Sequence, residues 1–308
     1  MAKYTSNEVK DLVVNKVVDL LVTAQANNVA VAWNSNGNDG VPIKWDGSHY
    51  RGINIIMLWI AQAVNGYESN RFMTFNQARK LGGCVRKGEK SNLSVYADQY
   101  LCKEKDANNV VRLNPDGSER VFKQWYWKVN NVFNVDQIDG LPERFYAKAE
   151  TVPMTDRLAH AEEYIKNTKA DIRYGGNRAC YVPSQDFIRL PEKDQFKDMV
   201  GLYSVSLHEL VHWTMAKDRC NRDFEGSKKF GGKGYATEEL VAELGACMGL
   251  ARLGILAEPR QDHADYIANW LTALKNDKQF IFTASAKAQE SIDYLDTLQD
   301  EIKERKVA

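Results

Sequence analysis

Cysteine pairs are missing from this chain of 308 residues. Its five cysteines are an odd number, stand far apart, and form no Cys-x-x-Cys pair. This spacing argues against a disulfide framework and against a cysteine-ligated zinc knuckle, and it is typical of proteins from a reducing compartment. We therefore expect a cytoplasmic protein whose stability comes from its hydrophobic core.

Long apolar runs and an excess of one charge sign are also missing. The longest apolar run, residues 53–64, is too short to span a bilayer and favours a buried helix. The first residues lead into a charged amphipathic segment and not into a signal peptide. Lys plus Arg equals Asp plus Glu, 41 of each, so the total charge indicates no partner. We expect no membrane partner.

Hydrophobic periodicity predicts an α+β region in the first half of the chain. Apolar residues recur at helical spacing over 6–26, and 53–65 is predicted to form a second helix. Capping boxes are predicted at Thr5 with Glu8 and at Thr74 with Gln77. Residues 93–101 and 121–135 are predicted strands, joined through an Asn-Pro-Asp-Gly turn. In the second strand, the tryptophans lie on the face opposite Tyr126.

The second half is predicted to be rich in helices, with a small sheet. Gly140, Pro142 and Pro153 interrupt the pattern, so we place a linker at 141–154 between domains at 1–140 and 155–308. A helix near 155–168 precedes a hairpin and a short strand. The predicted hairpin pairs 171–174 with 178–183, the strand is 187–190, and the long helices are 193–217, 236–253, 260–276 and 283–304.

The clearest chemical signal is the sequence His-Glu-Leu-Val-His at residues 208–212. On a helix, His208 and His212 lie one turn apart on the same face, where both imidazoles reach one ion. Neutral imidazole suits Zn²⁺, and a catalytic site keeps an open position for water. Glu209 is placed to accept the proton of that water and to return it to a leaving amine. The pattern predicts a metallopeptidase-like site.

A third protein ligand is expected on the following helix. Glu239 and Glu243 share one face of that helix, whereas Glu238 is turned about 100° away. We predict Glu239 as the ligand and Glu243 as the carboxylate that holds a zinc-bound histidine by its other ring nitrogen. The two roles can be exchanged, and Glu238 is a third choice. Another divalent transition metal can replace Zn²⁺ at such a site.

The histidine motif is short, and its surroundings decide how to interpret it. The helix around it is mostly apolar, which suits a buried site better than a solvated charge pair. A carboxylate-bearing helix follows, and strands precede the motif. These features favour a metal site. They do not separate an active zinc peptidase from a site kept for structure.

Positive charge is concentrated between residues 71 and 128. This segment holds twelve Lys or Arg and six Asp or Glu, a net charge of +6 in a neutral chain. Aromatic residues are interleaved with the charges, as in grooves that stack the bases of single strands. On composition alone, the simpler interpretation is that the tryptophans fill the core and the lysines keep the surface soluble.

A family resemblance changes that balance. Blocks in both halves, within about residues 5–255, resemble ArdC-type antirestriction proteins. The blocks are Trp45-x5-Arg51-Gly52-Ile53-Asn54, Leu58-Trp59, Thr74-Phe75-x2-Ala78, Leu81-Gly82-Gly83, Val85-Arg86-Lys87-Gly88-Glu89-Lys90, Val132-Phe133-Asn134-Val135-Asp136-Gln137, Val182-Pro183, Leu190-Pro191, His208-Glu209-Leu210-Val211-His212-Trp213-Thr214 and Tyr235-Ala236-x-Glu238-Glu239-Leu240-Val241-Ala242-Glu243-Leu244-Gly245-Ala246.

The resemblance implies a single-stranded-DNA-binding domain at 1–140 and a zincin-like metallopeptidase domain at 155–308. It also implies carriage on a plasmid, phage or other mobile element and protection of incoming DNA from host restriction. His208, His212 and Glu239 carry over as metal ligands and Glu209 as the catalytic acid/base. The residues expected to contact DNA are Arg51, Arg71, Arg79, Lys80, Arg86, Lys87, Lys90, Trp125, Tyr126 and Lys128.

Three functions remain open on the sequence. The first is a protein that coats entering single-stranded DNA and carries an attached metal domain. The second is a working zinc endopeptidase that cleaves a host restriction or defence protein, with DNA binding for localisation. The third is a DNA-binding module whose metal site only stabilises the fold.

Overall fold

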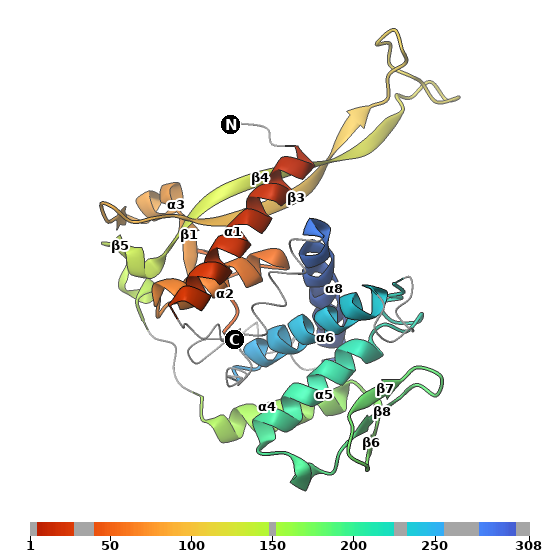
Figure 1. Cartoon of the computed structure of the whole chain (residues 1–308). Coiled ribbons are helices and arrows are strands. Elements are labelled where there is room, and N and C mark those ends of the chain that lie inside the picture. The colour runs from red at the N-terminus through yellow and green to blue at the C-terminus, as the bar shows by residue number, and fades with distance from the viewer. Residues whose placement is uncertain (1–4, 28–39, 148–151, 225–232, 256–276, 300–308) are drawn as a thin grey trace.

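The computed structural model describes residues 5–27, 40–147, 152–224, 233–255 and 277–299 (Figure 1). It has the predicted α+β composition, with sheets in the N-terminal half and a helix-rich C-terminal half that holds a small mixed sheet. No helix within the described ranges is long and apolar enough to cross a membrane.

The N-terminal half packs two helices against a three-stranded antiparallel sheet of order β1-β4-β3. Its elements are α1 (Ser6–Ala26), α2 (Ile53–Asn65), β1 (Phe72–Thr74), α3 (Phe75–Lys80), β2 (Cys84–Val85), β3 (Asn92–Lys103), β4 (Val121–Asn134), β5 (Ile138–Asp139) and short 3-10 turns at Val135–Gln137 and Glu143–Phe145. Both predicted capping boxes are present, at the starts of α1 and α3.

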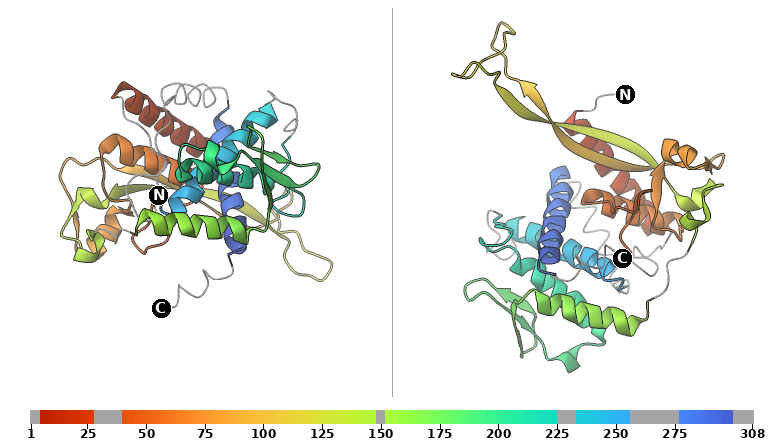
Figure 2. Two further views of the ribbon diagram at one scale, coloured as in Figure 1. Left: turned by 90° about the horizontal axis from the view of Figure 1, so that it is seen from below. Right: turned by 180° about the vertical axis from the view of Figure 1, so that it is seen from behind.

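Strands β3 and β4 continue beyond the body of the molecule as a long two-stranded arm (Figures 1 and 2). Its tip is held by isolated bridges between Lys105 and Val111 and between Leu113 and Glu119. Large apolar side chains are exposed near the tip, and Leu101 is 65% exposed.

The two faces of this arm differ, as the alternation in the sequence predicts. Trp127 is partly buried and meets Phe282 of the C-terminal half edge to face, with ring centroids 6.1 Å apart. On the opposite face, Tyr126 contacts Tyr96 and Tyr100. The side chain of Trp125 lies outside the described part of the structure.

The C-terminal half consists of helices around a small sheet of order β6-β8-β7. Its elements are α4 (Met154–Asn167), β6 (Asp171–Tyr174), β7 (Cys180–Val182), β8 (Phe187–Leu190), a 3-10 turn at Lys193–Gln195, α5 (Met199–Trp213), α6 (Lys233–Arg252) and α8 (Lys278–Thr297).

The hairpin predicted between 171–174 and 178–183 is wrong. Strand β8 lies between β6 and β7, parallel to the first and antiparallel to the second. The physical reason is burial: Phe187, Ile188 and Leu190 of β8 are almost fully buried, whereas β6 and β7 are partly exposed. The most apolar strand takes the centre, and the two more polar strands become edges.

Two long helices also differ from their predicted limits. The helix predicted at 193–217 spans only Met199–Trp213. It begins at Met199 because the side chain of Asp198 caps it by accepting a hydrogen bond from the backbone N–H of Gly201. The helix predicted at 283–304 begins earlier, at Lys278. The helix predicted at 260–276 lies outside the described residues, as do residues 300–304.

The main hydrophobic core includes residues from both halves of the chain. The backbone N–H of Gly40 donates to the carbonyl of Ala251 at 3.0 Å, and that of Gly52 donates to Oε1 of Gln289 at 3.2 Å. Lys278 also pairs with Asp11 at the start of α1. The two halves therefore pack directly on one another, and the linker proposed at 141–154 stays a prediction.

Helices α5 and α6 approach closely at Gly245. A Cβ atom built on Gly245 would lie 2.6 Å from a methyl group of Val211 in α5. Val211 is fully buried and β-branched, so its side chain has little freedom to move aside. The absence of a side chain at position 245 sets the distance between these helices.

We expect Gly245→Ala to lower the free energy of unfolding by about 1–2 kcal/mol, because overpacking outweighs the gain in helix propensity. Chemical denaturation measures this quantity. Gly249→Ala in the same helix is the matched control, since its Cβ would meet only side-chain ends at 3.3 Å or more. Equal stability of the two variants would contradict the close approach.

Candidate metal centre

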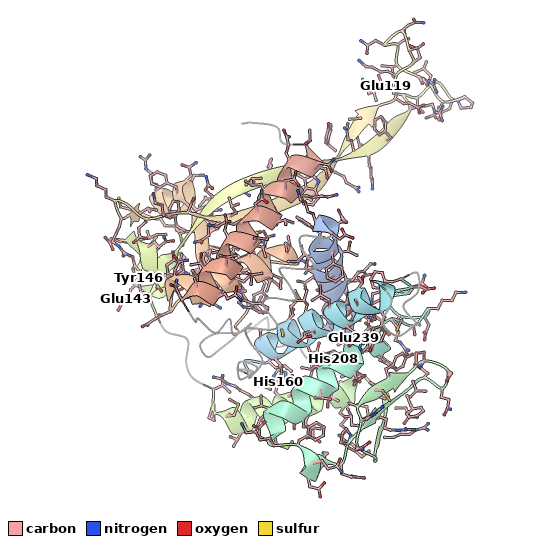
Figure 3. The ribbon with its side chains drawn as sticks, viewed as in Figure 1. Glu119, Glu143, Tyr146, His160, His208 and Glu239 are labelled. Carbon is pink, nitrogen blue, oxygen red and sulfur yellow. The ribbon has the colours of Figure 1, made fainter. Side chains whose placement is uncertain are left out.

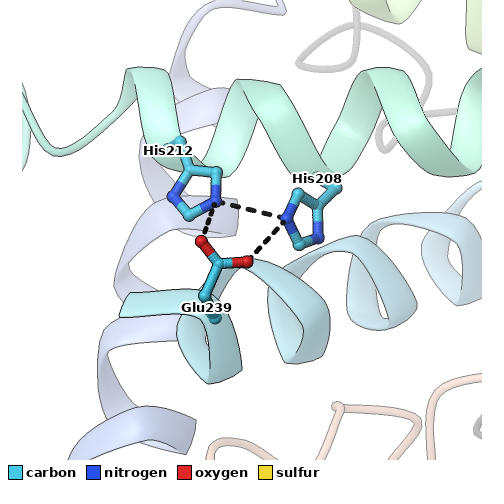
Figure 4. Close-up of side chains that lie close together, drawn as sticks. All are labelled: His208, His212 and Glu239. Atoms are coloured by element: carbon cyan, nitrogen blue, oxygen red, sulfur yellow. Dashed lines mark hydrogen bonds and ion pairs between the residues drawn. The ribbon is translucent and has the colours of Figure 1, made fainter. Parts of the chain in front are cut away.

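The two histidines of the motif lie one turn apart on α5 and face one carboxylate on α6 (Figure 4). Their Nε2 atoms are 3.2 Å apart. Glu239 places one carboxylate oxygen 3.6 Å from Nε2 of His208 and the other 3.6 Å from Nε2 of His212. Two nitrogens and a carboxylate therefore converge on one point.

The spacing of these donors fits a divalent ion. Tetrahedral ligands at zinc distances lie about 3.4 Å from one another, close to the separations within this triangle. His208, His212 and Glu239 are also the group that could hold a metal among the described residues. The set leaves a fourth position open, as in catalytic zinc sites, and its nitrogen and oxygen donors suit other divalent metals too.

The charges around the site favour an ionised Glu239. The hydrogen bond with His208 and the nearby imidazoles lower the pKa of Glu239, against the effect of partial burial. Burial lowers the pKa of His208, but Glu239, Glu209 and Glu243 together outweigh it and the net shift is upward. A carboxylate that stays ionised is a competent metal ligand.

Glu209 lies between the two histidines in sequence and is only 7% exposed. Burial raises the pKa of its carboxyl group, while the charges of His212 and His208 and the backbone N–H of Tyr181 oppose that shift. Tyr181 belongs to β7, an edge strand of the small sheet. A carboxylate with a raised pKa beside a metal site has the character of a general base.

The other ring nitrogen of His212 is held by Glu238, which sequence reasoning had placed third among the possible ligands. Nδ1 of His212 lies 3.1 Å from Oε1 of Glu238. The hydrogen bonds from Arg222 and His212 lower the pKa of Glu238 although its burial acts in the opposite direction. At His212, Glu238 takes the role that was predicted for Glu243, which is to hold the other ring nitrogen. At His208, that role of Glu243 stays a prediction.

Arg222 fixes Glu238 in turn, and sequence reasoning missed it. Its Nε donates to Oε2 of Glu238 at 2.7 Å and its Nη2 to Oε1 at 2.6 Å, a two-pronged pair. Its remaining N–H groups donate to the hydroxyls of Thr214 and Ser291 and to the carbonyl of Val211. Arg222 is 3% and Glu238 4% exposed.

Tyr235 at the start of α6 also belongs to the site. It shares a hydrogen bond with Glu239, which contributes to lowering the pKa of that carboxylate. Burial, Glu239 and Glu209 raise the pKa of Tyr235, so its hydroxyl stays protonated and able to donate. His160 is exposed on α4 (Figure 3), and His263 lies outside the described residues.

The residues predicted to contact DNA are spread over the N-terminal half. Arg51 pairs with Asp293 of α8. Arg71 lines a cavity. Arg86 is engaged by Glu89 and Asp139.

The remaining predicted DNA contacts lie at two places on the surface. Arg79 and Lys80 end α3, and Lys87 and Lys90 lie in the exposed turn before β3. Tyr126 and Lys128 lie together on one face of the arm, with the Lys128 ammonium 5.4 Å from the ring centroid.

We expect Arg222→Met to lower the free energy of unfolding by about 3–5 kcal/mol, because it leaves the Glu238 carboxylate buried and unpaired. It should also weaken metal binding about 10- to 100-fold, since His212 loses its support. Denaturation and calorimetric titration with Zn²⁺ or Mn²⁺ measure the two effects.

The double variant Arg222→Met/Glu238→Leu separates these effects: stability should recover while metal affinity stays low. Glu239→Ala should abolish binding, and Arg178→Gln, an exposed arginine of the same half, should change neither quantity. Metal binding at wild-type affinity in Arg222→Met would show that the pair does not support the site.

Two family models match the chain. The N-terminal domain of anti-restriction factor ArdC matches residues 7–133, and a zincin-like metallopeptidase matches residues 159–287. A curated relative, the uncharacterized protein y4eC of Sinorhizobium fredii (strain NBRC 101917 / NGR234), is 35% identical over 310 residues, covering 98% of this chain and 96% of that protein. Two DNA primases TraC of Escherichia coli are 37% and 36% identical over 256 residues, and the matches span 23% and 17% of their lengths.

Two solved structures are similar over almost the whole chain. The metal-free crystal structure of the antirestriction ArdC protein from plasmid R388 is 36% identical, with a TM-score of 0.69, and covers 94% of this chain and 97% of that one. The Mn(II)-bound structure of that protein is 33% identical, with a TM-score of 0.67 and coverages of 94% and 98%. The donors at His208, His212 and Glu239 accordingly form a divalent-metal site in a zincin-like domain, and the chain belongs to the ArdC-type antirestriction family.

Proposed function

We propose that this protein of a mobile element, a plasmid or a phage, binds single-stranded DNA and protects incoming DNA from host restriction. It carries a Zn²⁺ metallopeptidase-like domain beside its DNA-binding half. The observation that supports DNA binding best is the exposed tyrosine face of the β3–β4 arm.

The tyrosine face consists of Tyr96, Tyr100 and Tyr126, three rings on one side of two paired strands. Tyr126 lies 6.4 Å from Tyr96 and 5.8 Å from Tyr100, measured between ring centroids. Tyr96 and Tyr100 are 48% and 45% exposed. Rings that are already in place and open to solvent are stacking platforms for unpaired bases.

Cations accompany this face. Lys128 lies over the ring of Tyr126 on the same face of β4. Asp98 accepts hydrogen bonds from Tyr96 and Tyr126, and these bonds lower its pKa. These hydrogen bonds hold the hydroxyl groups of the two tyrosines in place and leave the faces of their rings available for stacking. The excess of positive charge over residues 71–128 supplies the attraction for phosphate.

A second candidate function, favoured by the buried Glu209, is an active zinc endopeptidase that cleaves a host restriction or defence protein. A bound divalent ion would lower the pKa of a water molecule at the open position to about 7. Glu209 would take the proton from that water and pass it to the leaving amine. Tyr235 holds Glu239 by a hydrogen bond and would keep the ligand in place. A metal site kept only for structure is the third possibility.

We expect the wild-type chain to bind a labelled dT20 oligonucleotide more tightly than a duplex of equal length, with affinity that falls as salt rises. Tyr126→Ala should weaken this binding about fivefold or more, the effect of losing one stacked base. Fluorescence anisotropy measures both. Tyr174→Ala, an exposed tyrosine of the C-terminal half, is the matched control. Absence of a single-strand preference would rule out the proposed mode of binding.

The Glu209→Gln variant separates the peptidase from the other two functions. It keeps the side-chain shape but removes the base, so an active peptidase should lose at least about 100-fold in rate while metal content is unchanged. Protection of incoming DNA is measured by transfer efficiency into restricting and non-restricting hosts. Full protection with the metal still bound would show that peptide cleavage does not cause this phenotype.

A further inference from the structure

A cavity of about 330 Å³ lies in the N-terminal half, away from both the metal site and the tyrosine face. It is lined by Trp45, Asp46, Gly47, Arg71, Arg144 and Phe145. These residues come from the turn before α2, the residue just before β1 and the 3-10 turn at Glu143–Phe145. Its volume is at the small end of the range for small-ligand pockets, about 300–1,000 Å³. Figure 3 labels Glu143 and Tyr146, the residues that precede and follow Arg144 and Phe145 in the sequence.

A tight turn presents Trp45 to this cavity. The backbone N–H of Gly47 donates to the carbonyl of Lys44 at 3.1 Å, and that of Lys44 donates to the carbonyl of Ser48 at 2.7 Å. Gly47 has φ +87°, a left-handed conformation that favours glycine. Asp46 closes the turn by accepting the N–H and hydroxyl of Ser48. The indole of Trp45 is 41% exposed on this ordered backbone.

Two guanidinium groups form another wall. Arg71 and Arg144 lie 5.4 Å and 5.2 Å from the ring centroid of Phe145, which is itself buried. Nη1 of Arg71 donates to the carbonyl of Lys44, which ties this wall to the turn. No carboxylate among the described residues lies within ion-pair distance of either guanidinium. Burial and the charge of Arg144 lower the pKa of Arg71, with Asp46 opposing them.

Such a pair of guanidinium groups favours an anion between them. Each repels the other, and arginine matches phosphate with two parallel hydrogen bonds. An exposed indole beside them supplies a flat surface of the size of a nucleobase. Phosphate and base are joined in one small ligand, a nucleotide.

We propose that this cavity holds one unpaired nucleotide of the bound DNA strand, with its base against Trp45 and its phosphate between Arg71 and Arg144. This inference rests on the proposed single-strand binding and adds a second contact site to it. Trp45 and Arg144 were not among the predicted DNA-binding residues. Asp46 lines the same space, where its carboxylate would accept a hydrogen bond from an N–H group of the base, such as N3–H of thymine.

The test uses the full chain and the dT20 anisotropy assay. Trp45→Ala should weaken binding about fivefold or more, and Trp45→Phe should restore most of the loss because it restores a stacking ring. Arg144→Gln should reduce the slope of log affinity against log salt by about 0.7, the loss of one phosphate contact on a single strand. Tyr174→Ala and Arg178→Gln, exposed residues of the C-terminal half, are matched controls and should bind like wild type.

A second measurement does not depend on the folding of any variant. A dT20 strand that contains 5-iododeoxyuridine is irradiated with the wild-type chain, and the crosslinked peptides are identified by mass spectrometry. We expect a crosslink at Trp45. Wild-type affinity in both Trp45→Ala and Arg144→Gln, or crosslinks that exclude Trp45, would overturn the inference and leave the tyrosine face as the DNA-binding surface. Failure of the wild-type chain to bind dT20 would instead reject single-strand binding itself, and with it this inference.

Discussion

The metal centre depends on one buried ion pair, between Arg222 and Glu238. All five N–H groups of the arginine have acceptors, and these come from α5, α6, α8 and the turn after α5. Two charges can be removed from water at tolerable cost only when their hydrogen bonds are replaced in this way. The pair therefore sets the positions of three helices as well as the charge of one carboxylate.

The pair also orients the ring of His212. Nδ1 of His212 lies against the Glu238 carboxylate, so a neutral ring with its proton on Nδ1 would donate to Glu238 and leave Nε2 available to bind a metal ion. Glu239, the next residue in the helix, lies 3.6 Å from Nε2 of the same ring and would be a ligand of the same ion. Two adjacent glutamates therefore act on opposite nitrogens of one imidazole.

The metal ligands could be predicted from the sequence because their geometry is local. His208 and His212 are brought together by helical spacing alone, and Glu239 needs only one further helix at contact distance. Arg222 could not be found in this way. The backbone N–H groups of Cys220 and Arg222 bond to carbonyls of Thr214 and Met215, which folds the chain back under α5. No periodicity in the sequence indicates such a turn.

The same limit explains the wrong strand pairing and why the contact between Glu238 and His212 was not predicted. Helical spacing predicts that Glu238 points away from the metal site. Its carboxylate does so, but it contacts the other ring nitrogen of His212 on α5. In the small sheet, the most apolar strand, β8, takes the centre. The prediction paired β6 with β7 because they are neighbours in the sequence, and that pairing is wrong. The cavity at Trp45 combines three distant segments, and only the folded chain places them together.

The packing of α8 against both halves couples them thermodynamically. Trp127 of the arm packs against Phe282 of this helix, and the hydroxyl of Ser291 in the same helix accepts a hydrogen bond from Arg222. A ligand that binds only the native chain stabilises every element that unfolds together with its site. A ligand bound to one half would therefore also make the other half more resistant to local opening and to proteolysis. This linkage needs no change in the shape of either site.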